Sequence, residues 1–333
     1  MADERPPVPD PATRELADGV LAHKRRALAK AITLVESTRA DHREQAHALV
    51  EALLPATGGA LRVGLSGVPG VGKSTFVEAL GLYLIEQGHR VAVLAVDPSS
   101  SVHGGSILGD KTRMELLSRR PEAFIRPSPA AGALGGVANR TREAMLVCEA
   151  AGFDVVLVET VGVGQSEIAV AGMTDIFCLL QLPNAGDDLQ GMKKGIVEIA
   201  DLVAINKADI DKAATHRAQA QMQGAISMVR HAHPDWTPPV IPVSALKAEG
   251  IDVFWNTVLK FRETMVANGA FAARRRRQAG AWMWELIDHD LRARFRANVR
   301  VAEELPGLQA EVEQGQVTPA AAAVRLLGHL DNI

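Results

Sequence analysis

The chain is poor in cysteine, in aromatic residues and in net charge. Two cysteines occur among 333 residues, aromatic residues make up 4%, and the formal net charge is −3. Both cysteines, Cys148 and Cys178, lie within apolar stretches, which predicts reduced thiols in a cytoplasmic protein rather than a disulfide framework. The near-neutral charge argues against a general binder of nucleic acid or of anionic membranes.

Long hydrophobic runs are also absent. No uncharged apolar run approaches the ~18 residues that a membrane-spanning helix needs, and the first residues show no signal-peptide pattern. Hydrophobic residues account for 47% of the chain and charged residues for 23%. These fractions are close to globular averages of about 45–50% and 25%, so the composition excludes a disordered chain and predicts a globular protein with an aliphatic core.

The spacing of apolar residues changes along the chain. Residues 1–11 hold four prolines, which predicts a flexible tail. In residues 12–58, apolar residues recur every three or four positions, which predicts an N-terminal helical extension. From 59 to 265, short apolar runs alternate with helical windows, which predicts an α/β domain whose mostly parallel sheet is flanked by helices. The predicted strands are Leu61–Ser66, Val91–Val96, Phe153–Val158, Ile176–Leu182, Leu202–Asn206 and Val240–Val243.

Two segments of the first half carry more local predictions. Asp41 followed by Glu44 predicts a capping box at the start of a helix. The Gly- and Ser-rich stretch 98–139 is too long for an ordinary connection, and it therefore predicts a functional loop region.

Residues 266–333 return to helical spacing and predict a C-terminal arm. Two apolar stripes on one helix need two packing partners, which predicts that the arm forms a homodimer. The basic run Arg274–Arg277 favours a solvated helix face over a nucleic-acid patch, and Thr318 with Pro319 predicts the start of a last helix. The stripes consist of Trp284, Ile287, Leu291 and Phe295, with Trp282 and Leu286 beside them.

A phosphate-binding loop follows the first predicted strand. It fits G-x-x-x-x-G-K-[ST] at every position and precedes a helical window, which is the context of a nucleotide-binding P-loop. Its N–H groups would hold phosphate oxygens, Lys73 would lie between the β- and γ-phosphates, and Ser74 would bind Mg²⁺. The predicted nucleotide-binding residues are Gly67, Val68, Pro69, Gly70, Val71, Gly72, Lys73, Ser74 and Thr75.

Acidic residues near strand ends are the candidates for binding the metal. Asp97 and Glu159 each follow a predicted strand, and the carboxyl ends of parallel strands meet beside a P-loop. Glu159 has the position of a Walker-B acid, and Asp110 lies in the glycine-rich stretch as a third candidate. The alternative for each acid is a helix cap or a surface charge.

A second pair of strand-end motifs predicts the base. The carboxylate of Asp209 would accept hydrogen bonds from guanine N1–H and the guanine amino group; adenine lacks that amino group and would leave the acid unpaired. Lys207 would lay its alkyl stem along the base, and the segment Ser244-Ala245-Leu246 would supply a backbone N–H to guanine O6. The sequence therefore favours GTP over ATP. The predicted base-binding residues are Asn206, Lys207, Asp209, Ser244, Ala245 and Leu246.

Taken together, the motifs resemble those of the MeaB/ArgK family of P-loop GTPases. The resemblance runs over nearly the whole chain and is carried by GVPGVGKST, AVDPSS, GGSILGDKTRM, FIRPSP, VETVGVGQSE and NKAD. It implies a homodimeric chaperone of adenosylcobalamin-dependent methylmalonyl-CoA mutase, which uses GTP to control cofactor loading and to protect the mutase. It also implies switch segments at 97–110, 159–167 and 183–194, and Mg²⁺ coordination by Ser74, Asp97, Asp110 and, directly or through water, Glu159.

Apart from Lys73 and Glu159, two residues are candidates for catalysis. Gln165 is the nearest residue that would orient the attacking water, with a solvent-facing switch residue as the alternative. Lys193 would move toward the phosphates when a partner orders the third switch, with a solvated helix start as the alternative. A site left incomplete in the free protein predicts slow turnover that a partner accelerates.

Other functions are weighed against this hypothesis. A nickel-insertion GTPase chaperone would need a His/Cys cluster near the switches, and neither cysteine has a metal-like spacing. An ATP-dependent kinase of a transport system conflicts with the base motif. A GTPase switch with some other partner stays open.

Overall fold

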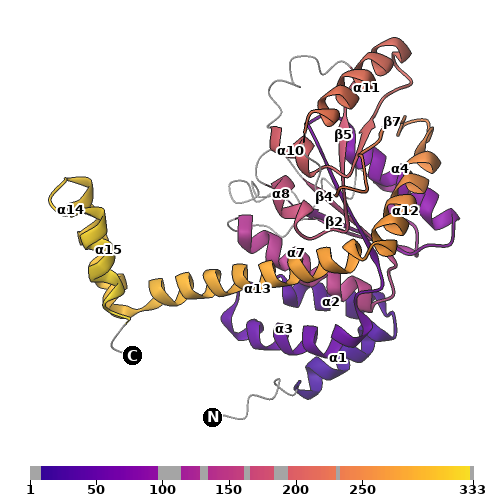
Figure 1. The fold of residues 1–333 in the computed structure, drawn as a ribbon. Helices are drawn as coiled ribbons and strands as arrows, with labels where there is room; N and C mark the ends of the chain where they lie inside the picture. The colour runs from indigo at the N-terminus through magenta and orange to yellow at the C-terminus, as the bar shows by residue number, and fades with distance from the viewer. Residues whose placement is uncertain are drawn as a thin grey trace. The chain divides into compact units, whose positions relative to one another are not determined.

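The computed structural model divides into two units, which are described separately (Figure 1). The first unit extends to Gln278, and the second begins at Ala279. The structure describes residues 9–96, 114–127, 134–160, 166–183, 194–229 and 233–330.

A seven-stranded parallel sheet forms the centre of the first unit. The strand order is β3-β2-β4-β1-β5-β6-β7, so the strand that leads into the P-loop lies between β4 and β5. Every pairing between these strands is parallel, which places their carboxyl ends along one edge. The strands are β1 (Leu61–Gly67), β2 (Val91–Val96), β3 (Ala123–Arg126), β4 (Val155–Thr160), β5 (Ile176–Gln181), β6 (Leu202–Ile205) and β7 (Val240–Pro242).

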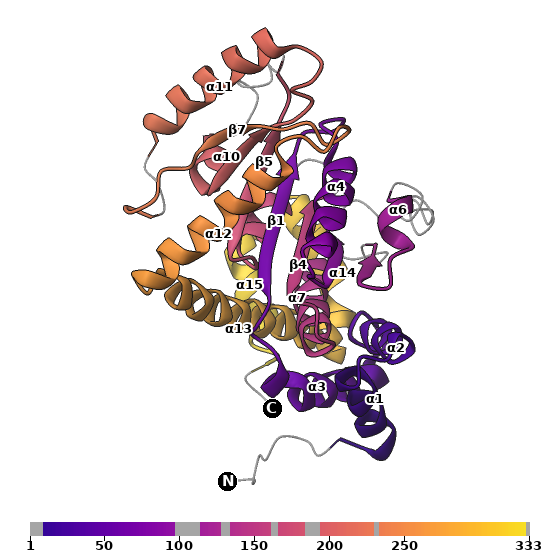
Figure 2. The ribbon, with the colours of Figure 1, turned by 90° about the vertical axis from the view of Figure 1, so that its right-hand side faces the viewer.

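Helices cover both faces of this sheet because its strands are apolar on both sides. In β4, Val155 and Leu157 belong to one core cluster, and Val156 and Val158 belong to the other. Figure 2 shows α4 and α12 beside β1. The cluster of Val155 includes α4 (Lys73–Glu86), α6 (Glu115–Ser118) and α12 (Ile251–Ala267); the other includes α1 (Pro11–Leu21), α2 (Arg25–Val35), α3 (Ala40–Leu53), α7 (Leu134–Ala150), α8 (Ser166–Ala171), α10 (Lys194–Ile199) and α11 (Lys212–Ser227).

Six of the seven strands lie where the sequence predicts them, with ends that differ by up to two residues. The prediction of a loop over 98–139 is wrong in part, because α6, β3 and the start of α7 fall within it. β3 has only four residues, Ala-Phe-Ile-Arg, at the edge of the sheet. A run this short gives no clear period, so the sequence pattern misses it.

The helices α1, α2 and α3 lie within the predicted N-terminal extension, and they pack on one another and on α7. A short 3₁₀ turn, η1 (Leu54–Ala56), follows α3. The predicted capping box is wrong: α3 begins after Arg39, and no side chain caps it. The guanidinium of Arg39 instead holds the carboxylate of Asp41, with Nε–Oδ1 at 2.9 Å and Nη2–Oδ2 at 2.6 Å.

The basic run at the start of α13 (Ala270–Ala297) is also not a solvated face throughout. Arg275 donates to both carboxylate oxygens of Asp175, at 2.7 and 2.6 Å, and Arg274 donates to Asp201 at 2.9 Å. Each aspartate directly precedes a strand and is almost fully buried. The two arginines therefore attach α13 to the amino ends of β5 and β6, where buried carboxylates need a counter-charge.

The second unit contains the rest of α13 and two further helices. α14 (Val299–Glu313) and α15 (Pro319–Leu327) pack through a small core of their own. The predicted start of the last helix is confirmed, because Thr318 Oγ1 accepts from the N–H of Ala321 at 3.3 Å and Pro319 is the first helical residue. The buried core residues are Val301, Leu308, Ala322 and Leu326.

Candidate nucleotide-binding site

The P-loop joins β1 to α4 through two glycines with left-handed backbone angles. Gly70 has φ +80° and Gly72 has φ +91°, conformations that favour glycine. A Cβ atom on Gly72 would lie 2.9 Å from Asn206 Nδ2, so the loop needs glycine there for packing as well. Val71 between them is fully buried, while Pro69 is exposed. The loop is thus fixed at Val71 and open toward solvent at its tip.

Lys73 begins α4 and turns its ammonium back over the loop. Its Nζ donates to the carbonyl oxygens of Gly67 at 2.6 Å and Val68 at 3.4 Å. Burial lowers the pKa of Lys73, and the charges of Glu159 and Glu167 act in the opposite direction. The ammonium therefore lies inside the loop with two carboxylates nearby, which is the position from which a lysine reaches a phosphate. Ser74 and Thr75 follow it in the first turn of α4.

Glu159 lies near the carboxyl end of β4, between the two neighbouring strands. It is 3% exposed and is in register with Leu65 of β1 and Ala95 of β2. The next residue, Thr160, shares a 2.9 Å hydrogen bond with Ser66 Oγ at the end of β1. A buried carboxylate is thereby held one strand away from the P-loop.

These residues fit a magnesium site in their chemistry. A hydroxyl from Ser74 and a carboxylate from Glu159 are hard oxygen donors of the kind that Mg²⁺ prefers. A third predicted donor, Asp97, follows the last residue of β2, and β2 pairs with β4 up to Val96–Thr160. Among the described residues, no group of three or more His, Cys, Asp or Glu side chains could hold a metal ion.

The predicted base-binding residues that follow β6, called the base motif below, are hydrogen-bonded to the P-loop. Asn206 Nδ2 donates to the carbonyl of Val71 at 2.8 Å, and its Oδ1 accepts from the N–H of Ala245 at 3.0 Å. Lys207, with φ +60°, reaches the carbonyl of Gly70 through Nζ at 2.9 Å. The structure thus brings the P-loop, the end of β6 and the loop after β7 to one place at the carboxyl edge of the sheet.

Asp209 is oriented by the loop after β7. Ser244 Oγ donates to Asp209 Oδ1 at 2.7 Å, and Lys247 Nζ lies 3.9 Å from Oδ2. The Ser244 hydroxyl and, to a lesser extent, the Lys247 charge lower the pKa of Asp209, so the carboxylate is ionised at neutral pH. An ionised carboxylate is the acceptor that a guanine N–H pair requires. Leu246 is 82% exposed beside it.

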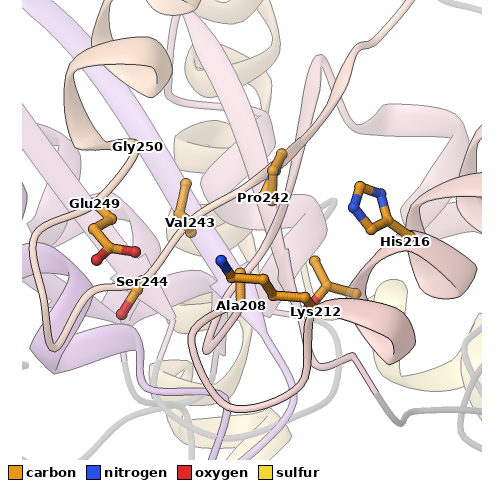
Figure 3. Close-up of a pocket in the computed structure, with 9 residues that line it drawn as sticks. Ala208, Lys212, His216, Pro242, Val243, Ser244, Glu249 and Gly250 are labelled. Atoms are coloured by element: carbon orange, nitrogen blue, oxygen red, sulfur yellow. The ribbon is translucent and has the colours of Figure 1, made fainter.

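A small cavity lies next to this base motif (Figure 3). It has a volume of about 230 Å³ and is bounded by the start of α11 on one side and the loop Ser244–Gly250 on the other. Ser244 is shared between the cavity wall and the hydrogen bond to Asp209. The backbone of Ser244 pairs with that of Glu249, which closes the loop.

Four predicted site residues lie outside the described residues. They are Asp97, Asp110, Gln165 and Lys193.

The sequence pattern does not single out Glu167 or Lys247. Glu167 is 3% exposed in the first turn of α8, and its charge acts on Lys73. Its place in the VETVGVGQSE segment is the one signal in the sequence that points to it. Lys247 directly follows Ser244-Ala245-Leu246, but only the fold shows that its ammonium approaches Asp209.

The parallel sheet, the P-loop on its central strand and the guanine motif beside it define a P-loop GTPase. Comparison with known proteins agrees with this class and narrows it. The family model described as "Methylmalonyl Co-A mutase-associated GTPase MeaB" matches residues 28–300, and the chain belongs to the MeaB family.

Relatives of high similarity cover nearly the whole chain. A Caulobacter vibrioides protein that carries GTPase in its name is 58% identical over 308 residues, 92% of this chain and 94% of the relative. The mouse protein named "Methylmalonic aciduria type A homolog, mitochondrial" is 48% identical over 326 residues, 94% of this chain and 78% of the relative. A crystal structure described as that of a "LAO/AO transport system kinase" superposes with a TM-score of 0.77 at 36% identity, over 97% of this chain and 99% of that one. The chain is therefore a GTPase.

Helices capable of crossing a membrane were sought in the described ranges. None of these helices combines the necessary length with the necessary apolar character.

Proposed function

We propose that the protein is a GTP-dependent chaperone of adenosylcobalamin-dependent methylmalonyl-CoA mutase, which gates cofactor loading and protects the mutase. The preference for a guanine nucleotide is supported by one observation: the Ser244 hydroxyl donates to Asp209 and orients an ionised carboxylate at the predicted base-binding position. The mutase part is supported by the family match over residues 28–300. The protein would work in the cytoplasm, with no nucleic-acid or membrane partner.

In the proposed reaction, water attacks the γ-phosphoryl group of GTP in line with the leaving oxygen. The amides of the P-loop and the ammonium of Lys73 neutralise charge on the phosphates, and Asp209 holds the guanine. Gln165 would orient the water, and Lys193 would complete the site when the mutase is bound. Mg²⁺ would supply further positive charge at the phosphates, held by Ser74, Asp97, Asp110 and Glu159.

We also propose the domain organisation that the sequence predicts. Residues 12–58 would form the helical extension, 59–265 the GTPase domain and 266–333 a dimerisation arm; of the tail predicted over 1–11, residues 1–8 lie outside the described residues and Pro11 begins α1. The exposed apolar side chains of α13 support the last of these, because such a stripe is stabilised by a second copy. They include Met283 at 51%, Trp284 at 62%, Leu286 at 38%, Ile287 at 36% and Leu291 at 58% exposed.

The similar crystal structure bears the name of a transport-system kinase, and kinase activity is therefore the second candidate. The orientation of Asp209 favours a guanine nucleotide, whereas such a kinase would use ATP. Incubation with labelled GTP or ATP and a cell extract separates the two: a labelled phosphoprotein would support the kinase, and phosphate release alone supports the GTPase. Nickel insertion is the third candidate, and metal titration by calorimetry tests it.

Complex formation tests the mutase partnership directly. We expect the full-length protein to co-elute from gel filtration with an adenosylcobalamin-dependent methylmalonyl-CoA mutase, in an amount that depends on whether GDP or a non-hydrolysable GTP analogue is present. A mutase without the adenosylcobalamin cofactor and one loaded with it should differ in affinity. Separate elution under every nucleotide condition would contradict the proposed partner.

A further inference from the structure

The short helix α8 takes part in a different interaction at each of its ends. It has six residues, Ser166–Ala171, and its first turn carries the buried Glu167 whose charge acts on Lys73. Its far end lies against α13, within the first unit. A helix of this length spans only about 9 Å at 1.5 Å per residue, so a displacement of one end carries the other with it.

The side of α8 that faces the sheet is tightly packed. Thr174 Oγ1 donates to the carbonyl of Val170 at 2.8 Å and closes the turn after the helix. On β1, a Cβ at Gly64 would lie 2.6 Å from Thr174 Oγ1 and 2.8 Å from Val170 Cγ1. This close approach shows that α8 and the turn after it pack directly on the backbone of β1, as expected for a close-packed interior.

The far end of α8 is held by one amide of α13. Gln278 Nε2 donates to the carbonyl of Ala171, the last residue of α8, at 3.3 Å, and to the carbonyl of Thr174, in the connection to β5, at 2.8 Å. The last carbonyl groups of a helix lack intrahelical partners. The Oε1 of Gln278 is buried and has no hydrogen-bond partner in the described part of the chain. An unsatisfied buried oxygen is costly, so packing alone would not select glutamine at this position.

We propose that Gln278 is a positioning residue for GTP hydrolysis, which acts by fixing α8 and thereby the Glu167 carboxylate near the P-loop lysine. Arg275, one turn earlier in α13, fixes the same stretch of helix to Asp175 at the start of β5. The helix α13 then continues beyond Gln278 into the second unit. A displacement of α13 would therefore move the Gln278 amide, and with it α8 and the Glu167 carboxylate in its first turn.

A substitution of nearly the same shape separates the hydrogen bonds that the Gln278 amide donates from the packing of the side chain. Gln278→Glu keeps the shape but replaces the donating amide by a carboxylate that faces two carbonyl oxygens. Gln278→Lys keeps a donor of different shape. Arg276→Gln is the matched control, because Arg276 is exposed on the same helix. The readouts are kcat and KM for GTP, the melting temperature, and hydrogen exchange of the amides of residues 167–174, all on the full chain.

We expect Gln278→Glu to lower kcat about five- to tenfold with KM for GTP changed less than about twofold, because the nucleotide-binding contacts are untouched. Exchange in residues 167–174 should become faster in that variant only. Gln278→Lys and Arg276→Gln should stay within about twofold of the parent kcat. If Gln278→Glu does not fold, Gln278→Ala replaces it, since alanine also removes the donor.

Three results would overturn the proposal. The first is an unchanged kcat in Gln278→Glu or Gln278→Ala. The second is an equal loss in Gln278→Lys, and the third is a loss of kcat that follows the fall in melting temperature, because either of these would indicate that the side chain only stabilises the fold. The proposal rests on the GTPase activity and not on the mutase partnership, so none of these results bears on the partner.

Discussion

The side-chain amide of Asn206 bridges the P-loop and the loop after β7, because it donates to the carbonyl of Val71 at 2.8 Å and accepts from the N–H of Ala245 at 3.0 Å. Asn206 is 1% exposed, so water has little access to these groups. One side chain thus holds the phosphate-binding loop and the base-binding loop in a fixed relation. A nucleotide that spans both loops meets a site that is already organised.

Replacing this bridge should weaken nucleotide binding. Asn206→Ala leaves the carbonyl of Val71 and the N–H of Ala245 without partners, at a cost of about 1–3 kcal/mol for each buried group. We expect GDP affinity to fall by roughly 10- to 100-fold, measured by titration of a fluorescent GDP analogue. The control is Asn268→Ala, which loses two exposed hydrogen bonds, one donated to Asp235 and one accepted from the N–H of Ala270. An affinity for GDP within twofold of the parent would show that the bridge does not organise the site.

The base specificity should depend on the charge of Asp209. Asp209→Asn converts one acceptor into a donor, and an amide donor matches the O2 of xanthine rather than the amino group of guanine. We expect preference to move from GTP to XTP, measured by competition against a fluorescent nucleotide. Lys247→Gln, which keeps the carboxylate, should retain guanine preference. An unchanged preference in Asp209→Asn would mean that the base is recognised elsewhere.

The ion pair between Arg275 and Asp175 should contribute strongly to stability. The Asp175 side chain is 1% exposed and also accepts from the N–H of Arg62, so loss of the guanidinium leaves a buried charge uncompensated. Arg275→Ala should lower the free energy of unfolding by about 3–5 kcal/mol. Arg276→Ala, on the exposed side, should change it by less than about 0.5 kcal/mol. Urea unfolding of the two variants checks this, and equal effects would refute the assignment.

The local motifs could be predicted from the sequence because each lies within a few consecutive residues. The P-loop and Asn206–Asp209 follow predicted strands, and a parallel sheet brings the carboxyl ends of its strands to one edge. The sheet itself was predictable for the same reason, since apolar runs of four to seven residues stand out. β3 is the exception, because only three apolar residues precede its arginine.

The connections between motifs could not be predicted, because they join residues far apart in the chain. Val71 and Asn206 are 135 positions apart, and Asp175 and Arg275 are 100 apart. The spacing within Arg274–Arg277 shows four basic residues in a row, but not that two of them meet buried aspartates. Glu167 lies in a recognisable motif, yet its burial follows only from how α8 packs on the sheet.

Stability should depend on pH through Glu143 in α7. Burial raises the pKa of Glu143 from 4.5 to about 7, against the effect of Arg140. The unfolded chain loses this proton near pH 4.5 while the folded chain keeps it until about pH 7, so the free energy of unfolding falls as pH rises through this window. Below about pH 4.5, Glu143 is protonated in both the folded and the unfolded chain and does not lower the free energy of unfolding.

Glu143→Gln removes the titration and should therefore stabilise the protein at high pH. We expect a gain of about 1–3 kcal/mol at pH 8 and a much smaller change at pH 5, measured by urea unfolding. The matched control is Glu263→Gln, an exposed glutamate on α12. A gain of equal size at both pH values would contradict the assignment.

The central claim, a GTPase that serves a cobalamin-dependent mutase, is tested most directly by GTP turnover with and without the partner. Phosphate release should be measured for the full-length protein alone and with saturating adenosylcobalamin-dependent methylmalonyl-CoA mutase, with Lys73→Ala as the inactive control. The account predicts slow release alone and an increase of at least about tenfold with the mutase. Fast release by the protein alone, or a rate that the mutase leaves unchanged, would contradict it.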